Sequence, residues 1–512
     1  MDRPSLWTAT ARAPRFPPLE SSLSADVVVV GGGIAGVTAA LLLQRSGAEV
    51  VLLEARRLGE GETGHTTAHL TEVLDTRYHA LESSFGLDGA RAAAASSRAA
   101  IDRIEALVGE LDAPCGFSRV PAFLVARTAE QRRELEVELE AMLRVGLDAG
   151  WTDALPYPVE SRGAVRIERQ AQLHPLEYLR ELSARAAAAG ARIFEGARVR
   201  EIRDGRPASV VTDRGSVTAR DVLVLTNHPI SGRFGVHTKI ADYRTYVIAL
   251  GPVAPPAGAE GLLWDLDHPY HYVRTHATPD GTFLVVGGED HKTGHEGATT
   301  ARFAALEAWA RPLWPVSLVA HRWSGQVVEP ADGLPFIGRH PGAKHVHDGT
   351  GFSGSGMTFG TLAAMVLADA VSGVPNPWAA LYDARRVRPL AQARRFVAEN
   401  ADVAARLARD RVRGGRPAPA GVGSITPGEG RLVREGGKVL AVARRGDGSL
   451  SVRSAVCPHL GCHVQWNAAE ESWDCPCHGS RFEAEGGVLH GPSTRELGEA
   501  EADVERPAER VD

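Results

Sequence analysis

The stretch "DVVVVGGGIAGVTAALLLQRSGAEVVLLEA", residues 26–55, decides how the front of the chain folds. It predicts a strand over residues 26–30, a tight turn, a helix over about residues 34–44 and a second strand over residues 49–54. The chain therefore begins with a strand–helix–strand unit whose first turn is made of glycine.

Three glycines in this stretch, Gly31, Gly33 and Gly36, follow the pattern G-x-G-x-x-G directly after the first strand. The first permits the tight turn, the second lets the backbone approach a pyrophosphate, and the third lets helix and strand pack closely. Phosphates would lie at the helix N-terminus, and Glu54 at the end of the second strand is placed to bind ribose hydroxyls. Because strand, helix and acidic residue accompany the glycines, we predict a Rossmann-like dinucleotide-binding domain.

A second dense motif, "CPHLGCHVQWNAAEESWDCPCHGSRF", lies at residues 457–482. It contains two boxes, CPHLGC and CPCHGS, and each box offers one cysteine–histidine pair. A Rieske [2Fe-2S] centre needs this set, because two thiolates bind one iron and two imidazoles bind the other. We predict Cys457, His459, Cys475 and His478 as the cluster ligands. A zinc site of Cys and His ligands is the alternative, although zinc does not explain why these two boxes are paired.

The two boxes resemble those of Rieske proteins, in which the second cysteines form a disulfide that clamps the cluster loops. The resemblance implies a Cys462–Cys477 disulfide and a hydrogen bond from Ser480 to a cluster sulfur. High-potential Rieske proteins carry a tyrosine where this chain has Phe482, so we expect a potential in the middle or lower part of the Rieske range. His463 is outside the ligand pattern and is expected at the surface or in a loop.

Three further segments are rich in glycine: "GEGETGHTTAHLT" (59–71), "DGLPFIG" (332–338) and "HDGTGFSGSGMTFGTLAAMVLADAVSG" (347–373). The last predicts a glycine-rich turn opening a second helix, whose N-terminus would meet the flavin end of an extended FAD. Together these pieces resemble the D-amino acid oxidase (DAO) family of FAD-dependent oxidoreductases, which includes glycine oxidase and sarcosine and dimethylglycine dehydrogenases. A mobile loop is the alternative interpretation of the late glycines.

This resemblance implies FAD as cofactor, with the backbone at Val199 of "GARVREI" contacting the adenine. Sarcosine and dimethylglycine dehydrogenases carry FAD covalently on a histidine at the place of His65, so a covalent bond and a noncovalent position near the flavin ring are both open here. The predicted cofactor-binding residues are Gly31, Gly33, Gly36, Glu54, His65, Thr66, Thr67, Val199, Gly333, Gly351, Gly354, Gly356 and Met357.

The predicted fold class is α/β plus β, and the domain order resembles bacterial FAD-dependent oxidoreductases with a C-terminal Rieske domain. Alternating apolar runs such as "TYVIAL", "HYVRT" and "TFLVVGG" predict an antiparallel sheet that roofs the flavin. The predicted boundaries are an oxidoreductase at 1–398, with FAD-binding parts at about 24–110, 155–228 and 330–395 and the substrate sheet at about 229–329, a helix and Pro/Gly-rich linker at 399–422, and a small all-β Rieske domain at 423–512.

On the substrate side we single out His271, Tyr272 and Arg274 of "HPYHYVRTH", which would alternate between the faces of a roof strand. Arg274 is placed to hold a substrate carboxylate, or is an exposed structural arginine. The segment before "DGLPFIG", "HRWSGQVVEPA", lacks the arginine-containing stretch that grips the carboxylate in amino acid oxidases. Amino acid substrates are therefore in doubt.

A flavin accepts two electrons and a [2Fe-2S] cluster accepts one, so their union predicts an enzyme that oxidises a C–N bond of a small amine or N-methylated amine and passes electrons singly to an external acceptor. A Rieske-coupled oxygenase or demethylase is one alternative. A redox-sensing or electron-carrier flavoprotein without its own organic substrate is the other. The oxygenase would draw its iron ligands from His268, His271, His276, His291 and His295.

Composition narrows the remaining classes of function. The net charge of -6 gives no electrostatic footprint for nucleic acid. We find no apolar stretch long enough to span a bilayer and no apolar segment of a signal peptide in the first 25 residues, so a cytoplasmic protein is expected. Cys115, outside the two boxes, is expected to be a small buried or loop thiol.

Overall fold

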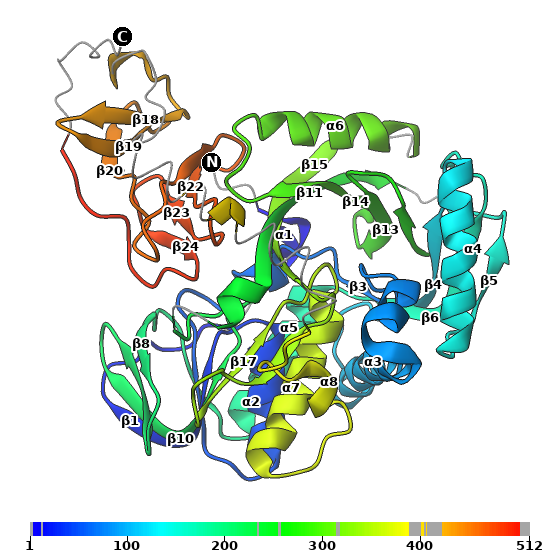
Figure 1. Cartoon of the computed structure of the whole chain (residues 1–512), viewed down its shortest axis with the longest axis horizontal. Helices are drawn as coiled ribbons and strands as arrows, with labels where there is room; N and C mark the ends of the chain where they lie inside the picture. The colour runs from blue at the N-terminus through cyan, green and yellow to red at the C-terminus, as the bar shows by residue number, and fades with distance from the viewer. Residues whose placement is uncertain are drawn as a thin grey trace.

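The computed structural model describes residues 4–11, 14–232, 235–253, 258–313, 318–388, 401–403, 406 and 422–501. In Figure 1 the strands that follow residue 430 form an orange-to-red unit beside a larger α/β body. Most of the predicted linker and the end of the predicted Rieske domain lie outside the described residues.

The first sheet of the large body has a parallel centre built on the glycine-rich start of the chain. β1 (Leu23–Val30) pairs in parallel with β2 (Val50–Leu53) and with β10 (Ser216–Val224). The sheet is completed by β7 (Arg192–Phe194), β8 (Val199–Arg203), β9 (Ala208–Thr212), β16 (Phe336–Arg339) and β17 (Val346–Thr350). The expected Rossmann-like architecture is confirmed.

Two helices whose N-termini follow glycine-rich turns pack against each other beside this sheet (Figure 1). α2 (Ile34–Arg45) is the predicted first helix, and α7 (Gly356–Ser372) is the predicted second one. Their close approach favours glycine at position 360, because an added Cβ would lie 3.1 Å from Ile34 Cγ2 and would push it back. The late glycine-rich segment therefore opens a packed helix, which overturns its alternative interpretation as a mobile loop.

The second sheet is antiparallel except where β12 runs parallel to β4. It also takes strands from residues 69–172, so it is larger than the segment 229–329 in which the alternating runs were recognised. Its strands, from one edge to the other, are β15 (Val319–Pro330), β11 (Ile240–Val253), β14 (Gly281–Lys292), β13 (His271–Thr278), β12 (Leu262–Asp265), β4 (Ser118–Val125), β6 (Ala164–Gln172) and β3 (His69–Leu70), with β5 (Ala149–Thr152) paired to β6.

The other helices cover the two sheets. α6 lies on β11 and β14, where Phe303 meets Tyr246 edge to face at 4.9 Å between ring centroids. In the described part of the chain, no helix combines the length and the apolar composition that a membrane span requires. These helices are α1 (Leu6–Thr10), α3 (Tyr78–Leu111), α4 (Ala129–Arg144), α5 (Pro175–Ala188), α6 (Thr300–Ala310) and α8 (Ala379–Tyr382).

The C-terminal domain consists of two small antiparallel sheets, as predicted for an all-β module. Its core is formed by apolar side chains and the box cysteines, including the fully buried Trp473 and Phe482. The strands are β18 (Gly430–Glu435), β19 (Lys438–Arg444) and β20 (Leu450–Ser454) in one sheet, and β21 (Gln465–Asn467), β22 (Ser472–Asp474), β23 (Arg481–Glu483) and β24 (Val488–His490) in the other.

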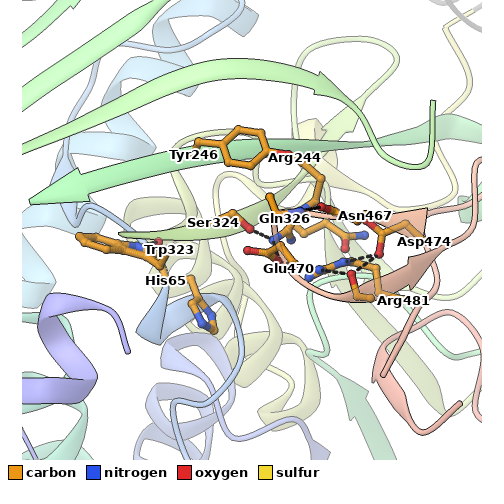
Figure 2. A network of polar contacts seen from close by, with 12 residues as sticks. His65, Arg244, Tyr246, Trp323, Ser324, Gln326, Asn467, Glu470, Asp474 and Arg481 are labelled. Carbon is orange, nitrogen blue, oxygen red and sulfur yellow. Dashed lines mark hydrogen bonds and ion pairs between the residues drawn. The ribbon is translucent and has the colours of Figure 1, made fainter. Parts of the chain in front are cut away.

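A buried network of charged side chains joins this domain to the second sheet (Figure 2). Arg244 of β11 is 1% exposed, and its guanidinium donates to Glu470 Oε2 at 2.5 Å and to the Ser324 hydroxyl. The same Glu470 oxygen accepts from Arg481 at 2.6 Å, and Arg481 also bonds Asp474 at 2.9 Å. Glu470 is therefore shared by one arginine from each domain.

The charges of this network hold Glu470 ionised. Burial by itself would raise the pKa of Glu470, but Arg244 and Arg481 outweigh it and lower the pKa to about 2. A second contact nearby is uncharged: the Thr299 hydroxyl donates to Asn467 Oδ1 at 2.8 Å and accepts from the backbone of Ala469 at 3.0 Å. The C-terminal domain is thus docked by the charged network on β11 and by a polar contact at Thr299, the N-cap of α6.

We expect Glu470→Gln to destabilise the docked protein by about 3–5 kcal/mol, because it leaves the buried Arg244 charge without its counter-ion. The measurement is chemical unfolding of the full-length holoprotein, followed by loss of cluster absorbance. The matched control is Glu485→Gln, which removes an exposed partner of Arg445 at 3.3 Å and is expected to change stability by less than about 0.5 kcal/mol. Equal effects of the two variants would contradict the role of the network.

The stability difference between wild type and Glu470→Gln should depend on pH, because the pKa of Glu470 is lowered. The stabilisation is complete above the ordinary carboxyl pKa of 4.5 and is lost as the pH falls from 4.5 towards about 2, because protonation removes the charge that Arg244 and Arg481 bind. The stability gap between wild type and Glu470→Gln should therefore narrow over this range.

Candidate flavin cavity and iron–sulfur centre

A large cavity lies between the two sheets, with about 1820 Å³ of space counting the part open to solvent. It extends from the glycine turn after β1 to the aromatic residues of β12 and β13. Among the predicted cofactor-binding residues, those in its wall are Gly31, Gly33, Glu54, His65, Thr66, Thr67, Val199, Gly354, Gly356 and Met357. Gly36, Gly333 and Gly351 are not in the wall.

The glycine turn has the close packing that a phosphate cradle requires. Gly31 has a φ of +110°, and an added Cβ there would lie 2.4 Å from the carbonyl oxygen of Leu225. A Cβ on Gly36 would lie 1.9 Å from the carbonyl oxygen of Gly31. Gly33 precedes α2 and so presents the helix N-terminus to the cavity. The backbone here fits a bound pyrophosphate.

Glu54 directly follows β2, at the place expected for a ribose contact. One of its carboxylate oxygens accepts from the backbone of Gly32 at 2.7 Å and the other from the backbone of Arg56 at 2.8 Å. Burial raises the pKa of Glu54, while these two hydrogen bonds oppose the rise. Since Glu54 and Val199 line the same region of the wall as Arg198, this region fits the adenosine part of a dinucleotide.

His65 follows the short 3₁₀ turn η1 (Glu62–Gly64) and lines the cavity. Its Nδ1 lies 3.0 Å from the carbonyl oxygen of Gly61, to which it donates, and its own carbonyl accepts from Trp323 at 2.8 Å. Burial lowers the pKa of His65, so the ring is neutral with Nε2 unprotonated. This geometry is compatible with both predicted relations of His65 to the flavin.

The late glycines divide into two groups. Gly354 and Gly356 lie in the cavity wall at the start of α7, and the Gly354 backbone donates to Asp75 Oδ2 at 2.6 Å. Gly351, with a φ of +75°, and Gly333, with a φ of +86°, shape the adjoining loops instead, and a Cβ on Gly333 would lie 2.4 Å from the Thr76 side chain.

The structure separates the three predicted substrate-side residues. Tyr272 lines the cavity, and its hydroxyl lies 2.8 Å from that of Thr245. His271 points away from this wall, where its Nδ1 lies 2.8 Å from Asp265 Oδ2 and its ring stacks on Trp309.

Arg274 is fully buried behind the wall. It donates to the carbonyl oxygen of Leu173 at 2.9 Å and lies over the ring of Trp7. Its interpretation as an exposed structural arginine is therefore wrong: the β13 backbone turns it into the core, where carbonyl groups and an aromatic face surround it.

The cavity roof also contains residues that the sequence did not single out. Trp264, Tyr270 and Thr245 line it, and Asp290 lies beside the Thr245 and Tyr270 side chains. Burial, together with the nearby carboxylates of Glu329 and Asp75, raises the pKa of Asp290 to about 7. Only the pairing of β11, β13 and β14 brings these residues together, so no local pattern could have identified them.

The two cysteine boxes fold into equivalent loops. In each, the first cysteine's N–H donates to a carbonyl five residues later, Cys457 to Cys462 at 2.9 Å and Cys475 to Ser480 at 2.8 Å. The N–H four residues after the first cysteine donates back to that cysteine, from Gly461 in one loop and from Gly479 in the other, at 3.0 Å each. The loops thus present matching ligand atoms.

The predicted ligands converge between these loops. Cys457 and Cys475 are buried free thiols, and hydrogen bonding from the Cys475 thiol lowers the pKa of Cys457. The rings of His459 and His478 are 4.9 Å apart, and His478 Nδ1 is buried with no hydrogen-bond partner among the described residues. Two thiolates and two imidazoles in one buried place fit a Rieske cluster.

Three further residues or pairs beside the cluster ligands were predicted from the sequence: the Cys462–Cys477 disulfide, Ser480 and His463. Cys462 and Cys477 form the expected disulfide, with their Cα atoms 6.5 Å apart. Ser480 is fully buried, and its hydroxyl accepts from the backbone of Ser493 at 3.0 Å and hydrogen-bonds Cys457. His463 is buried, bridging to Val456. It is therefore not at the surface, but it does lie in the segment between the first box and β21, outside the strands, in keeping with the expected loop position.

The fifth cysteine, Cys115, lies outside the two boxes. Cys115 is buried, and burial raises the pKa of its thiol to about 11. It therefore behaves as the small buried thiol that was expected.

Comparisons with known proteins agree with both sites. The sequence pattern described as "FAD dependent oxidoreductase" (DAO) matches residues 26–370, and that of the Rieske [2Fe-2S] domain matches residues 420–501. The Rieske 2Fe-2S iron-sulfur protein YhfW of Bacillus subtilis is 32% identical over 501 residues, which cover 97% of each chain. Gamma-glutamylputrescine oxidoreductase of Escherichia coli is 26% identical over 376 residues, 70% of this chain and 86% of its own.

A solved structure shares the fold of the large body. Glycine oxidase from Geobacillus kaustophilus superposes with a TM-score of 0.61 at 20% identity, covering 71% of this chain and 99% of its own. The Rieske match decides against the zinc alternative for the cysteine boxes. With its FAD cavity and its buried two-cysteine, two-histidine centre, the chain belongs to the DAO family of FAD-dependent oxidoreductases and carries a C-terminal Rieske [2Fe-2S] domain.

Proposed function

We propose that this oxidoreductase oxidises a C–N bond of a small cationic amine to an imine, which water hydrolyses to a carbonyl compound and an amine, and that the electrons leave singly through the cluster to an external acceptor. FAD supplies a two-electron acceptor and the cluster a one-electron acceptor. The observation that carries the proposal is the direct hydrogen-bonded connection between the cavity wall and a cluster loop, made by Gln326.

Gln326 of β15 contacts both sites. Its backbone N–H donates to Glu62 Oε2 at 2.7 Å, and both residues line the flavin cavity. Its side-chain amide donates to the carbonyl oxygen of Gly479 at 3.0 Å and to Asp242 Oδ1 at 2.8 Å. Gly479 directly follows the predicted ligand His478. One residue therefore spans the separation between the two sites, which supports electron transfer with the domains in their docked position.

The charges of the cavity roof support a cationic substrate. Asp75 lies in the wall, Asp290 lies behind Thr245 and Tyr270, and Asp290 Oδ1 is buried with no hydrogen-bond partner among the described residues. The arginines of the wall, Arg56 and Arg198, belong to the region of Glu54 and Val199. A substrate carboxylate at the roof would meet carboxylates, whereas an ammonium group would be matched by them.

The aromatic residues of the roof complete this site. Trp264, Tyr270 and Tyr272 present ring faces and edges to the cavity, and the rings of the two tyrosines lie 5.6 Å apart. Such rings exclude water and attract cations through their negative faces. In the proposal they orient the amine over the flavin, while the roof carboxylates hold a positive charge away from the carbon that is oxidised.

The oxygenase alternative has less support. Four of its five candidate histidines have separate neighbours: His271 bonds Asp265, His276 meets Trp7, His291 bonds Tyr246 and His295 bonds Pro476. Within the described ranges, neither group of three metal-binding side chains contains two histidines. The electron-carrier alternative is decided by the first experiment below.

Anaerobic titration with amines tests the proposal directly. We expect diamines or N-methylated amines without a carboxylate to bleach the flavin absorbance first and then to produce the EPR signal of the reduced cluster. Amino acids of similar length serve as controls and should reduce the flavin far more slowly, because the roof repels their carboxylate. If no amine reduces the flavin while a chemical reductant reduces both centres, the carrier alternative is favoured.

The pH profile of amine oxidation tests the roof carboxylate. Asp290, with a pKa of about 7, is neutral below that pH and negative above it, so kcat/KM for a cationic amine should rise with pH through about 7. Asp290→Asn should abolish this rise and lower kcat/KM roughly tenfold or more, since hydrogen bonds to charged groups contribute about 1.5–3 kcal/mol. Asp280→Asn, at an exposed turn of the same sheet, should keep the wild-type profile.

Gln326→Leu tests the connection between the two sites. Because it removes the amide that bonds Gly479, we expect reduction of the flavin by amine to stay near the wild-type rate while the following reduction of the cluster slows. Stopped-flow absorbance and freeze-quench EPR separate these steps. The control Gln44→Leu alters α2, which packs away from the cluster. A wild-type rate of cluster reduction in Gln326→Leu would rule out this route.

A further inference from the structure

A short segment of the Rieske domain lies in the wall of the flavin cavity. It consists of the end of β24 and the loop that follows, and its cavity-lining residues are Val488, Leu489, His490, Gly491, Ser493 and Thr494. None of the segments predicted to bind FAD includes these positions. The cavity is therefore closed by both domains, although the dinucleotide-binding fold belongs to one of them.

Both ends of this segment are tied to the residues on either side of Val199. Arg198 donates to the carbonyl oxygen of Val488 at 3.0 Å, and Arg200 donates to that of Thr494 at 2.6 Å. The Thr494 hydroxyl donates in return to the carbonyl oxygen of Arg200 at 3.2 Å. The two arginines flank Val199, whose backbone is the predicted adenine contact. The segment is thus held where the adenosine part of FAD would lie.

The other contacts of the segment reach towards the flavin side. His490 Nε2 lies 3.4 Å from Glu62 Oε1, and Glu62 and His65 both line the cavity. Gly491 packs against Ile230, which also lines the cavity, because an added Cβ would come 3.1 Å from Ile230 Cγ2. Burial and the positive charges of nearby arginines lower the pKa of His490 well below its usual value, so the ring is neutral and adds no charge beside the cofactor.

We propose that residues 488–494 of the Rieske domain are part of the FAD site and close it over the adenosine and pyrophosphate portion of the cofactor. His490 and the backbone of the loop contact the dinucleotide, and Arg198 and Arg200 hold the loop in place. FAD can then leave only when this segment moves away, so the Rieske domain retains the flavin in addition to accepting its electrons.

The test uses the full-length holoprotein and follows FAD release after dilution by the fluorescence of free flavin. We expect His490→Ala to accelerate release by about five- to tenfold, the effect of losing one buried hydrogen-bonding contact. Thr494→Val, which keeps the size of the side chain and loses only its bond to Arg200, should accelerate release in the same direction. If FAD proves to be covalently attached, the same variants are compared by the rate at which added phosphodiesterase cleaves the FAD pyrophosphate.

The matched control is Arg445→Ala, an exposed position of the same domain paired with Glu485. The proposal requires faster release or cleavage in His490→Ala and Thr494→Val, an unchanged cluster EPR signal and no change in Arg445→Ala. It is overturned if both loop variants match wild type, if the control changes equally, or if the cluster is lost together with the flavin. Neither readout needs a substrate, so the outcome is independent of the proposed amine oxidation.

Discussion

The burial of one positive charge, that of Arg244, holds this two-cofactor protein together. Moving a guanidinium out of water costs several kcal/mol unless a counter-ion and hydrogen bonds replace the solvent. Arg244 belongs to the oxidoreductase sheet, but its counter-ion Glu470 belongs to the Rieske domain. The two domains are therefore energetically dependent on each other. The contacts of Gln326 with Gly479, and those of β24 with the flavin cavity, belong to the same docked interface as this ion pair.

Two paired strands of one sheet, β11 and β15, contribute residues to both cofactor sites. Side chains alternate between the two faces of a strand. In the register of β11 with β15, Arg244 is opposite Gln326 and Thr245 is opposite Gly325. The first pair faces the Rieske domain, whereas the second pair faces the flavin cavity. The flavin cavity and the docked Rieske domain thus lie on opposite faces of these two strands, an arrangement suited to the short electron path that we propose.

Much of the fold was predictable because its decisive signals are local. The turn at Gly31, the helix opened by Gly356 and the paired cysteine boxes each lie within a few residues, and the structure has them where they were expected. Arg274 was misjudged because its burial depends on segments distant in sequence, around Leu173 and Trp7. Asp290, Gln326 and His490 were missed for the same reason, since only strand pairing and domain docking give these ordinary polar residues their neighbours.

The Rieske domain is docked mainly through polar contacts, and both domains are parts of one polypeptide. Two separate electron-transfer proteins must meet by diffusion, so their rate depends on how much of each is present. Covalent linkage replaces that encounter by a high effective concentration, and a modest polar interface is then sufficient for stable docking. The internal electron step proposed for this protein should accordingly be first order, with a rate that dilution of the enzyme leaves unchanged.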